Sequence, residues 1–237
     1  MWQTGQLGPD NPRSLINTLW YHNTKLLGFW GCHENRQLRW GDILLDSDEN
    51  GEFFKFNESL SKTRQGSLGT HLRPFIPKIF ENKNNPARCP IKMYKLYADQ
   101  RPDGMKHDDS PFYLGINHKR ASAKAPWYKA QAMGENTLSK MMKSMCLAAG
   151  VSGKKTNHSL RSTMCTQLLH SGVPPTTIMQ LSGHKNVASV NNYAVASKQQ
   201  QSAMCSLLMN LQDGGAFLSP CVHRPFTPLP VNSAAIM

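Results

Sequence analysis

The segment from residue 157 to residue 193 constrains the fold of this chain most strongly. It reads NHSLRSTMCTQLLHSGVPPTTIMQLSGHKNVASVNNY. The proline pair that begins at Pro174 divides it into two predicted helices, because proline cannot continue a helix. Gly183 is a typical C-terminal stop for the second helix. His158 and Arg161 stand three residues apart, so we expect both side chains on one face of the first helix.

The polar side chains of this segment suit a phosphodiester. Arginine donates paired hydrogen bonds to phosphate oxygens, histidine donates a hydrogen bond or a proton, and a tyrosine hydroxyl can attack phosphorus. His184 follows a glycine, and Tyr193 stands nine residues after His184. Each of these side chains, taken singly, is more often an ordinary packing residue. Their common order and spacing favours a site that holds a phosphodiester.

An HxxR helix, a Gly-His turn and a tyrosine nine residues after the histidine resemble the C-terminal signature of the tyrosine recombinases. The amino-acid sequence of the whole segment resembles the Crypton-type recombinase-like domain even more closely. That domain is found in Crypton transposons and in the C-terminal regions of MYM-type zinc-finger proteins. The resemblance extends over most of residues 1–211. It implies an α+β fold, mostly helical with a small antiparallel sheet. Residues 212–237 are rich in proline and glycine and are predicted to be disordered.

The resemblance also implies a reaction that needs no metal and no cofactor. Tyr193 would attack a DNA phosphate and form a 3′-phosphotyrosyl bond. Arg161, His158 and His184 would stabilise the charged transition state. Lys62 would protonate the departing 5′-oxygen.

Basic residues around this set are expected to contact DNA. Lys62 lies in a predicted hairpin, where the resemblance places a lysine and where a side chain can reach a minor groove. It can also be an ordinary turn lysine, and Arg64 is close enough to be confused with it. Phosphate contacts are expected from Arg64, from Lys154 and Lys155 before the HxxR helix, and from Lys185 after the Gly-His turn.

The first catalytic arginine is the main departure from the recombinases. The resemblance places it in a G-L-R-G pattern, and the matching stretch here is GFWG at residues 28–31. Trp30 therefore stands at the arginine position. Arg36 and Arg39 lie roughly 120° and 180° around a helix from Trp30, so neither is expected to replace it. By analogy with the loss of one preorganised donor, the change should cost about 10²- to 10³-fold in rate.

The charge balance favours an anionic partner. Lys and Arg number 27 against 15 Asp and Glu, a formal charge of +12. Double-stranded DNA is the expected partner. The first residues lack the basic and apolar regions of a signal peptide, and no run approaches the ~18 apolar residues of a membrane span. We therefore expect an intracellular, nuclear protein. The six cysteines form no CxxC pair, so no zinc site is predicted.

The remaining elements are predicted from caps, periodicity and turns. A helix starts at Pro12 with Asp10 or Asn11 as its cap. Strands are expected over residues 43–46, 52–57, 71–76 and 112–117, and helices after Pro90, over 138–149 with Asn136 or Thr137 as cap, and over 196–212. In the recombinases the last helix often packs on a neighbouring protomer, so self-association is expected.

The basic stretch over residues 119–136 leaves two interpretations open. It embeds Trp127 and Tyr128 among lysines and arginine. Aromatic and basic side chains together are typical of a nucleic-acid surface. The same aromatic pair can equally anchor a loop to the core.

Three functions remain in view. A working recombinase is favoured by the HxxR, His and Tyr set. A DNA-binding module with impaired chemistry is favoured by Trp30, and also because the recombinase-like region begins near residue 1, whereas recombinases usually clamp DNA with an additional N-terminal domain. A protein-interaction domain is disfavoured by the charge of +12. The second function is the prediction.

Overall fold

The computed structural model describes residues 1–29, 32–57, 76–122 and 124–212, and these form two units. Unit 1 contains residues 1–164 and 180–183. Unit 2 contains residues 165–179 and the chain from His184 onward. No helix in the described ranges is long and apolar enough to cross a membrane.

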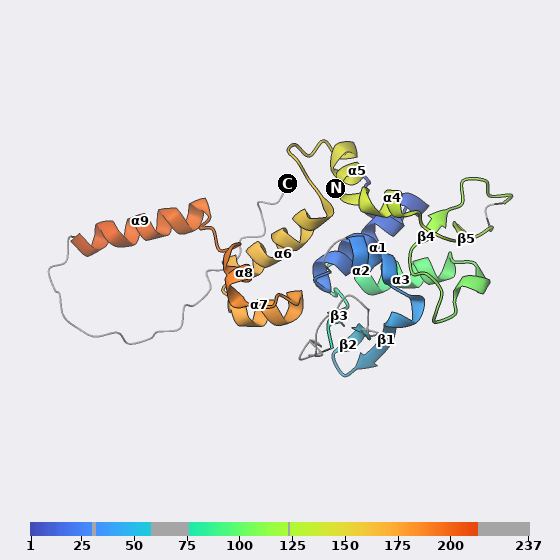
Figure 1. The fold of residues 1–237 in the computed structure, drawn as a ribbon, viewed down its shortest axis with the longest axis horizontal. Coiled ribbons are helices and arrows are strands. Elements are labelled where there is room, and N and C mark those ends of the chain that lie inside the picture. The colour runs from blue at the N-terminus through green and yellow to red at the C-terminus, as the bar shows by residue number, and fades with distance from the viewer. Residues whose placement is uncertain (30–31, 58–75, 123, 213–237) are drawn as a thin grey trace. The chain divides into compact units, whose positions relative to one another are not determined.

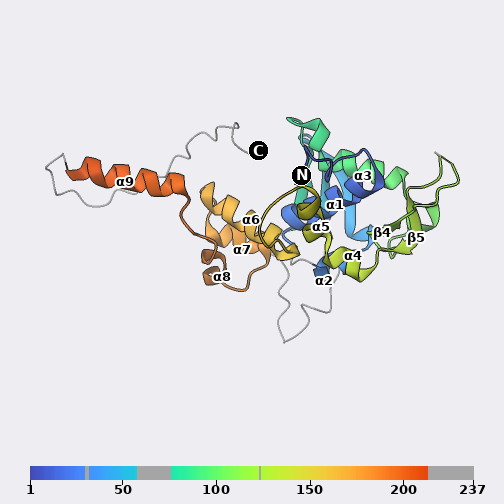
Figure 2. The ribbon, with the colours of Figure 1, turned by 90° about the horizontal axis from the view of Figure 1, so that it is seen from above.

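Helix α1 (Pro12–Leu26) is the centre of unit 1 (Figure 1). Asn11 caps it, with its Oδ1 accepting from the backbone N–H groups of Arg13 and Ser14, as one of the two predicted caps. Almost every side chain between Ser14 and Thr24 is buried. A helix buried nearly all round needs partners on several sides, and α2 (Cys32–Gln37) and α3 (Pro90–Asp99) both pack against it. Figure 2 shows α3 beside α1 from above.

A three-stranded antiparallel sheet packs on α3. Its strands are β1 (Ile43–Asp48), β2 (Gly51–Phe56) and β3 (Lys78–Phe80), in the order β1-β2-β3. Phe54 faces Leu45 on one side and Ile79 on the other. The predicted first two strands are confirmed. The third strand lies at Lys78–Phe80, beyond the predicted 71–76, and residues 71–75 lie outside the described ranges.

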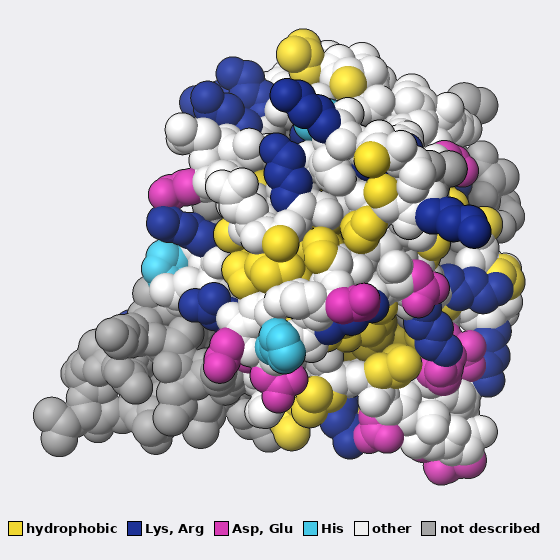
Figure 3. Space-filling model, turned by 90° about the vertical axis from the view of Figure 1, so that its right-hand side faces the viewer, with side chains coloured by type: hydrophobic (Ala, Val, Ile, Leu, Met, Phe, Trp, Pro, Cys, Tyr) yellow, Lys and Arg dark blue, Asp and Glu magenta, His cyan; other side chains and the backbone are white. Residues whose placement is uncertain are grey.

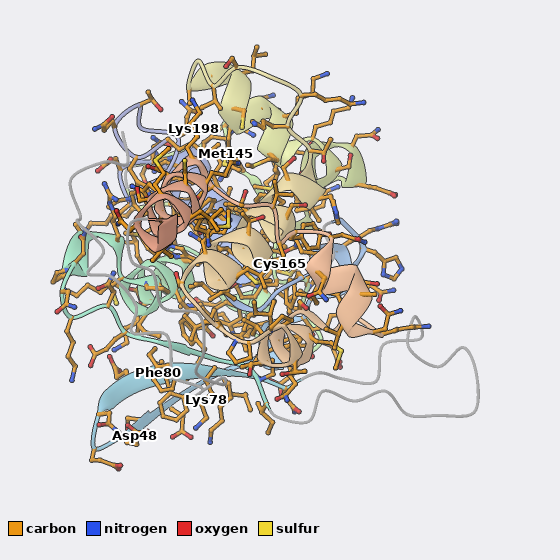
Figure 4. All side chains as sticks on the ribbon, turned by 90° about the vertical axis from the view of Figure 1, so that its left-hand side faces the viewer. Asp48, Lys78, Phe80, Met145, Cys165 and Lys198 are labelled. Atoms are coloured by element: carbon orange, nitrogen blue, oxygen red, sulfur yellow. The ribbon has the colours of Figure 1, made fainter. Side chains whose placement is uncertain are left out.

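The two faces of this sheet differ. Ile43, Phe54 and Ile79 are buried in the core. On the other face the Lys78 ammonium lies 4.3 Å from the centroid of the Phe53 ring, and the Phe80 ring lies 5.6 Å from it. Figure 4 labels Lys78 and Phe80 on this sheet. The alternation follows from the period of two along a strand.

The rest of unit 1 follows α3. Strands β4 (Leu114–Ile116) and β5 (Tyr128–Ala132) form a second antiparallel pair. The helix predicted over 138–149 is two helices, α4 (Glu135–Ser139) and α5 (Met141–Ala148), which meet at Lys140. Gly134 occupies the N-cap of α4, so the predicted caps at Asn136 and Thr137 are wrong. Short 3-10 turns cover Trp40–Asp42, Pro86–Arg88 and Asp103–Met105.

Four helices follow in the described residues up to 212. They are α6 (Asn157–His170), α7 (Pro175–Ser182), α8 (Val187–Asn191) and α9 (Lys198–Gln212). Gly172 and Gly183 follow α6 and α7 with φ of 80° and 68°, the left-handed conformation typical of a helix end. The predicted division of this segment into helices is confirmed.

Candidate active site

Helix α6 carries the HxxR pair, and its first residue is fixed inside unit 1. The buried side chain of Asn157 donates to the Leu138 carbonyl at 3.0 Å and accepts from the Met142 N–H at 3.3 Å. These two bonds tie the start of α6 to α4 and α5. The direction of α6 at His158 and Arg161 therefore depends on a buried amide four residues upstream of the arginine.

Arg161 is fully buried in unit 1. Its Nη1 donates to the carbonyl oxygen of Gly28 at 2.6 Å, across 133 residues of sequence. A hydrogen bond from a charged donor is stronger than one between neutral groups, so this contact holds the turn after α1 on α6. His158, three residues earlier on the same helix, is exposed. The two members of the predicted pair therefore sit in different environments.

Gly28 accepts this hydrogen bond and also lies close to the backbone of α7 at Leu181. Its φ is 65°, and a Cβ placed there would lie 2.8 Å from the carbonyl oxygen of Leu181. Leu181 lies in the last turn of α7, two residues before Gly183. A side chain at position 28 would therefore be strained by the backbone and would clash with main-chain atoms. This turn joins three parts of unit 1 that are far apart in sequence.

A buried polar network holds the elements on both sides of the turn at Gly28. Asn23 Nδ2 donates to the Tyr113 hydroxyl at 3.0 Å, and this hydroxyl donates to Asn35 Oδ1 at 2.8 Å. Asn35 Nδ2 then donates to Thr24 Oγ1 at 2.9 Å. All four side chains are buried. The network links the end of α1 to the middle of α2, and so fixes the two helices that flank residues 28–31.

His184 and Tyr193 lie together in unit 2. Their ring centroids are 5.9 Å apart with planes tilted by 53°. His184 is buried and Tyr193 is partly exposed. The short helix α8 accounts for this proximity, because Asn186 caps it through a bond from the Ser189 N–H at 2.9 Å. Its last turn then bonds Tyr193 N–H to the Val190 carbonyl at 3.0 Å. The chain between His184 and Tyr193 thus turns back through α8, which brings the Tyr193 phenol close to the His184 imidazole.

The other predicted residues divide into two groups. Lys154 and Lys185 are exposed and Lys155 is half-buried, as phosphate-contacting residues can be. Trp30, Lys62 and Arg64 lie outside the described residues. The roles assigned to all of these residues stay predictions. In the part of the chain that the structure describes, no three His, Cys, Asp or Glu side chains gather as a metal site would require.

Comparison with known proteins gives the family. Residues 1–147 match the family described as Domain of unknown function (DUF3504). The chain belongs to the DUF3504 family. It is 28% identical to Zinc finger MYM-type protein 2 of Homo sapiens over 168 residues, 65% of this chain and 12% of that protein. It is 28% identical to Transcriptional regulator QRICH1 of Homo sapiens over 148 residues, 60% of this chain and 19% of that protein. The chain thus spans less than a fifth of the length of these DUF3504 relatives.

The fold of this DUF3504 chain is that of the tyrosine recombinase catalytic domains. A crystal structure of the XerH site-specific recombinase, bound to palindromic difH substrate as a post-cleavage complex, matches with a TM-score of 0.52 and 15% identity. The match covers 83% of this chain and 46% of that one. The predicted fold class is confirmed: mostly helical, with a small antiparallel sheet. The predicted relation to MYM-type zinc-finger proteins is confirmed too.

Sequence reasoning missed two residues that position this DUF3504 site. The Gly28 carbonyl accepts from Arg161, and the Asn157 amide anchors α6. Gly28 was visible as the first glycine of the GFWG stretch, where a glycine after a helix indicates a left-handed turn. Asn157 carried no local signal, because its partners are Leu138 and Met142.

Proposed function

We propose that this chain is a DNA-binding domain of Crypton-type tyrosine recombinase ancestry, with impaired strand exchange and a nuclear location. The observation that carries the proposal is the fold, because XerH, which shares it, is a site-specific recombinase in complex with its substrate. The formal charge of +12 supports a polyanionic partner. Relatives named as a zinc finger protein and a transcriptional regulator support action on nuclear DNA.

Two features support the impairment. Trp30 stands where the resemblance places the first catalytic arginine, and a neutral indole offers no charge to a phosphate. Arg161 is fully buried and donates to the Gly28 carbonyl. A fully buried guanidinium needs a local rearrangement before it can contact a phosphate. Both features weaken stabilisation of the transition state without removing the surface charge that attracts DNA.

Equilibrium binding to a mixed-sequence duplex tests the DNA-binding part of the proposal. The affinity should fall steeply between about 50 and 200 mM salt, with a slope of log K against log[salt] near −0.9 for each phosphate neutralised. Fluorescence anisotropy of a labelled 30-base-pair duplex, at about five salt concentrations, measures this slope. Binding that is undetectable, or insensitive to salt, would overturn the proposal.

An active tyrosine recombinase is the second candidate. The proximity of His184 and Tyr193, 5.9 Å between ring centroids, favours it. In that case Tyr193 attacks the phosphodiester, the 3′-phosphotyrosyl bond forms, and the 5′-oxygen leaves with a proton from Lys62. The two candidates differ in one observable, since only the active enzyme forms a covalent adduct with DNA through Tyr193.

We also propose that α9 mediates self-association. Its apolar side chains are open to solvent: Met204 is 48% exposed, Leu207 63% and Leu208 65%. These three positions share one helix face, because residues three and four apart lie side by side. A continuous apolar stripe on an exposed helix is typical of a surface that packs against another helix. A second copy of this chain supplies a matching stripe.

A further inference from the structure

We propose that the described residues of the β4–β5 hairpin, 114–122 and 124–132, form a separate DNA-contact arm that binds duplex phosphates outside the candidate active site. This proposal rests on the proposed DNA-binding function and locates one surface that would carry it. The hairpin belongs to unit 1, and it extends beyond α3 and α4 in both Figure 1 and Figure 2.

The hairpin is attached to the core through its aromatic residues. Tyr128 is 1% exposed, and its hydroxyl donates to the Pro12 carbonyl at 2.9 Å. Its ring meets the Tyr97 ring edge-on at 4.8 Å between centroids. The Trp127 N–H donates to the Gln100 carbonyl at 3.2 Å, and the Trp127 carbonyl accepts from the Asn117 N–H at 2.9 Å. Tyr128 therefore anchors the hairpin and is not available to stack on bases, whereas the partly buried Trp127 is held through its backbone.

Tyr97 also holds β4, the strand that pairs with β5. Leu114 is fully buried, and its N–H donates to the Tyr97 hydroxyl at 3.1 Å. Burial raises the pKa of Tyr97 to about 12, so this hydroxyl stays neutral. Both strands of the hairpin are therefore held on the core. A preordered strand loses less conformational entropy on binding than a free segment.

The arm itself is basic and exposed. Between Ser110 and Gly134 the sequence has four Lys or Arg residues and no Asp or Glu. The four, all exposed, are Lys119, Arg120, Lys124 and Lys129. None of them forms an ion pair with a carboxylate of the described residues. Figure 3, which faces this side of the chain, shows Lys and Arg side chains over both its upper and its lower half, with Asp and Glu mainly in the lower half.

Three other lysines of unit 1 are each paired with a carboxylate. Lys83 lies 3.3 Å from Glu81, Lys95 lies 2.6 Å from Glu52, and Lys106 lies 2.8 Å from Asp103. A cation beside a carboxylate contributes less to attracting a phosphate, because the two fields partly cancel. The charges of the arm are therefore better phosphate ligands than these three paired lysines. Arg120 is also partly ordered, with its guanidinium carbon 6.0 Å from the Trp127 ring centroid.

The test compares two triple variants of the whole chain, each with three positive charges fewer. The arm variant is Lys119→Gln, Arg120→Gln and Lys124→Gln. The matched control is Lys83→Gln, Lys95→Gln and Lys106→Gln. Both are titrated with a labelled 30-base-pair duplex at several salt concentrations, after circular dichroism has established that each one folds. The arm variant should bind more weakly for every duplex sequence, with a salt slope reduced in magnitude by about 2 to 3.

The outcomes separate this proposal from the one it rests on. The control should keep a slope within about 1 of the unaltered chain, since its lysines are paired. If the unaltered chain binds and both variants lose the same slope, or the arm variant loses none, the arm is not a contact surface and only the further proposal fails. If the unaltered chain does not bind DNA, the proposed function fails with it.

Discussion

At the scale of single residues, His22 makes stability depend on pH. It is buried on α1, and its Nδ1 has no hydrogen-bond partner among the described residues. Burial, together with the charge of Lys25, lowers the pKa of His22 from 6.5 to about 4. Between these two values the unfolded chain binds a proton that the folded chain does not. Acid therefore favours unfolding in this window, by roughly 3 kcal/mol at its lower end.

A His22→Leu variant isolates this effect. Between pH 6.5 and pH 4, the free energy of unfolding should fall less in His22→Leu than in the unaltered chain, because the variant has no histidine at this position to protonate. Urea denaturation at pH 7.0, 5.5 and 4.5 measures the difference between the two proteins. An equal loss in both would assign the pH dependence to other groups.

Gly28 gives a second prediction at the residue scale. An alanine there adopts φ of 65° and meets the Leu181 carbonyl oxygen at 2.8 Å, so Gly28→Ala should destabilise by more than the roughly 1–2 kcal/mol of a left-handed alanine alone. Two controls separate the causes. Gly5→Ala has φ of 66° and open space, and Gly104→Ala has open space without a positive φ. Chemical denaturation should rank the losses Gly28, Gly5, Gly104. A loss at Gly28 no larger than at Gly5 would contradict the close contact.

At the scale of elements, α9 is the helix whose role is most open to test. Leu208→Lys places a charge on the apolar stripe, whereas Asn210→Lys places the same charge on an exposed polar position of the same helix. If α9 mediates self-association, the mass measured by sedimentation should rise with concentration in the unaltered chain and in Asn210→Lys. Leu208→Lys should remain monomeric. A mass that is the same for all three proteins would exclude this role.

The elements that the sequence predicted are those with local signals. Asp10 or Asn11 before Pro12 predicts the start of α1, and Gly183 predicts the end of α7, since caps act within one turn. The elements that it missed depend on distant partners. Strand β5 is formed by YKAQA, which has no strand pattern, and it is held by pairing with β4 and by the burial of Tyr128. The contact between Arg161 and Gly28 spans 133 residues and left no local mark.

At the scale of the whole molecule, charge and fold combine. The fold that this chain shares with XerH and its formal charge of +12 together support the proposed contact with DNA over many phosphates. The DUF3504 segment makes up a small share of its relatives Zinc finger MYM-type protein 2 and QRICH1. In these relatives the matching segment is therefore one part of a longer chain.

The yield of covalent protein–DNA adduct tests the central claim most directly. The unaltered chain, Trp30→Arg and Tyr193→Phe are incubated with nicked duplexes of random sequence, and adducts that survive denaturing electrophoresis are counted. The unaltered chain should bind these duplexes yet form about 10²- to 10³-fold less adduct than Trp30→Arg, if that variant restores the missing donor. Tyr193→Phe should form none. Abundant adduct from the unaltered chain, absent from Tyr193→Phe, would contradict the account and establish an active recombinase.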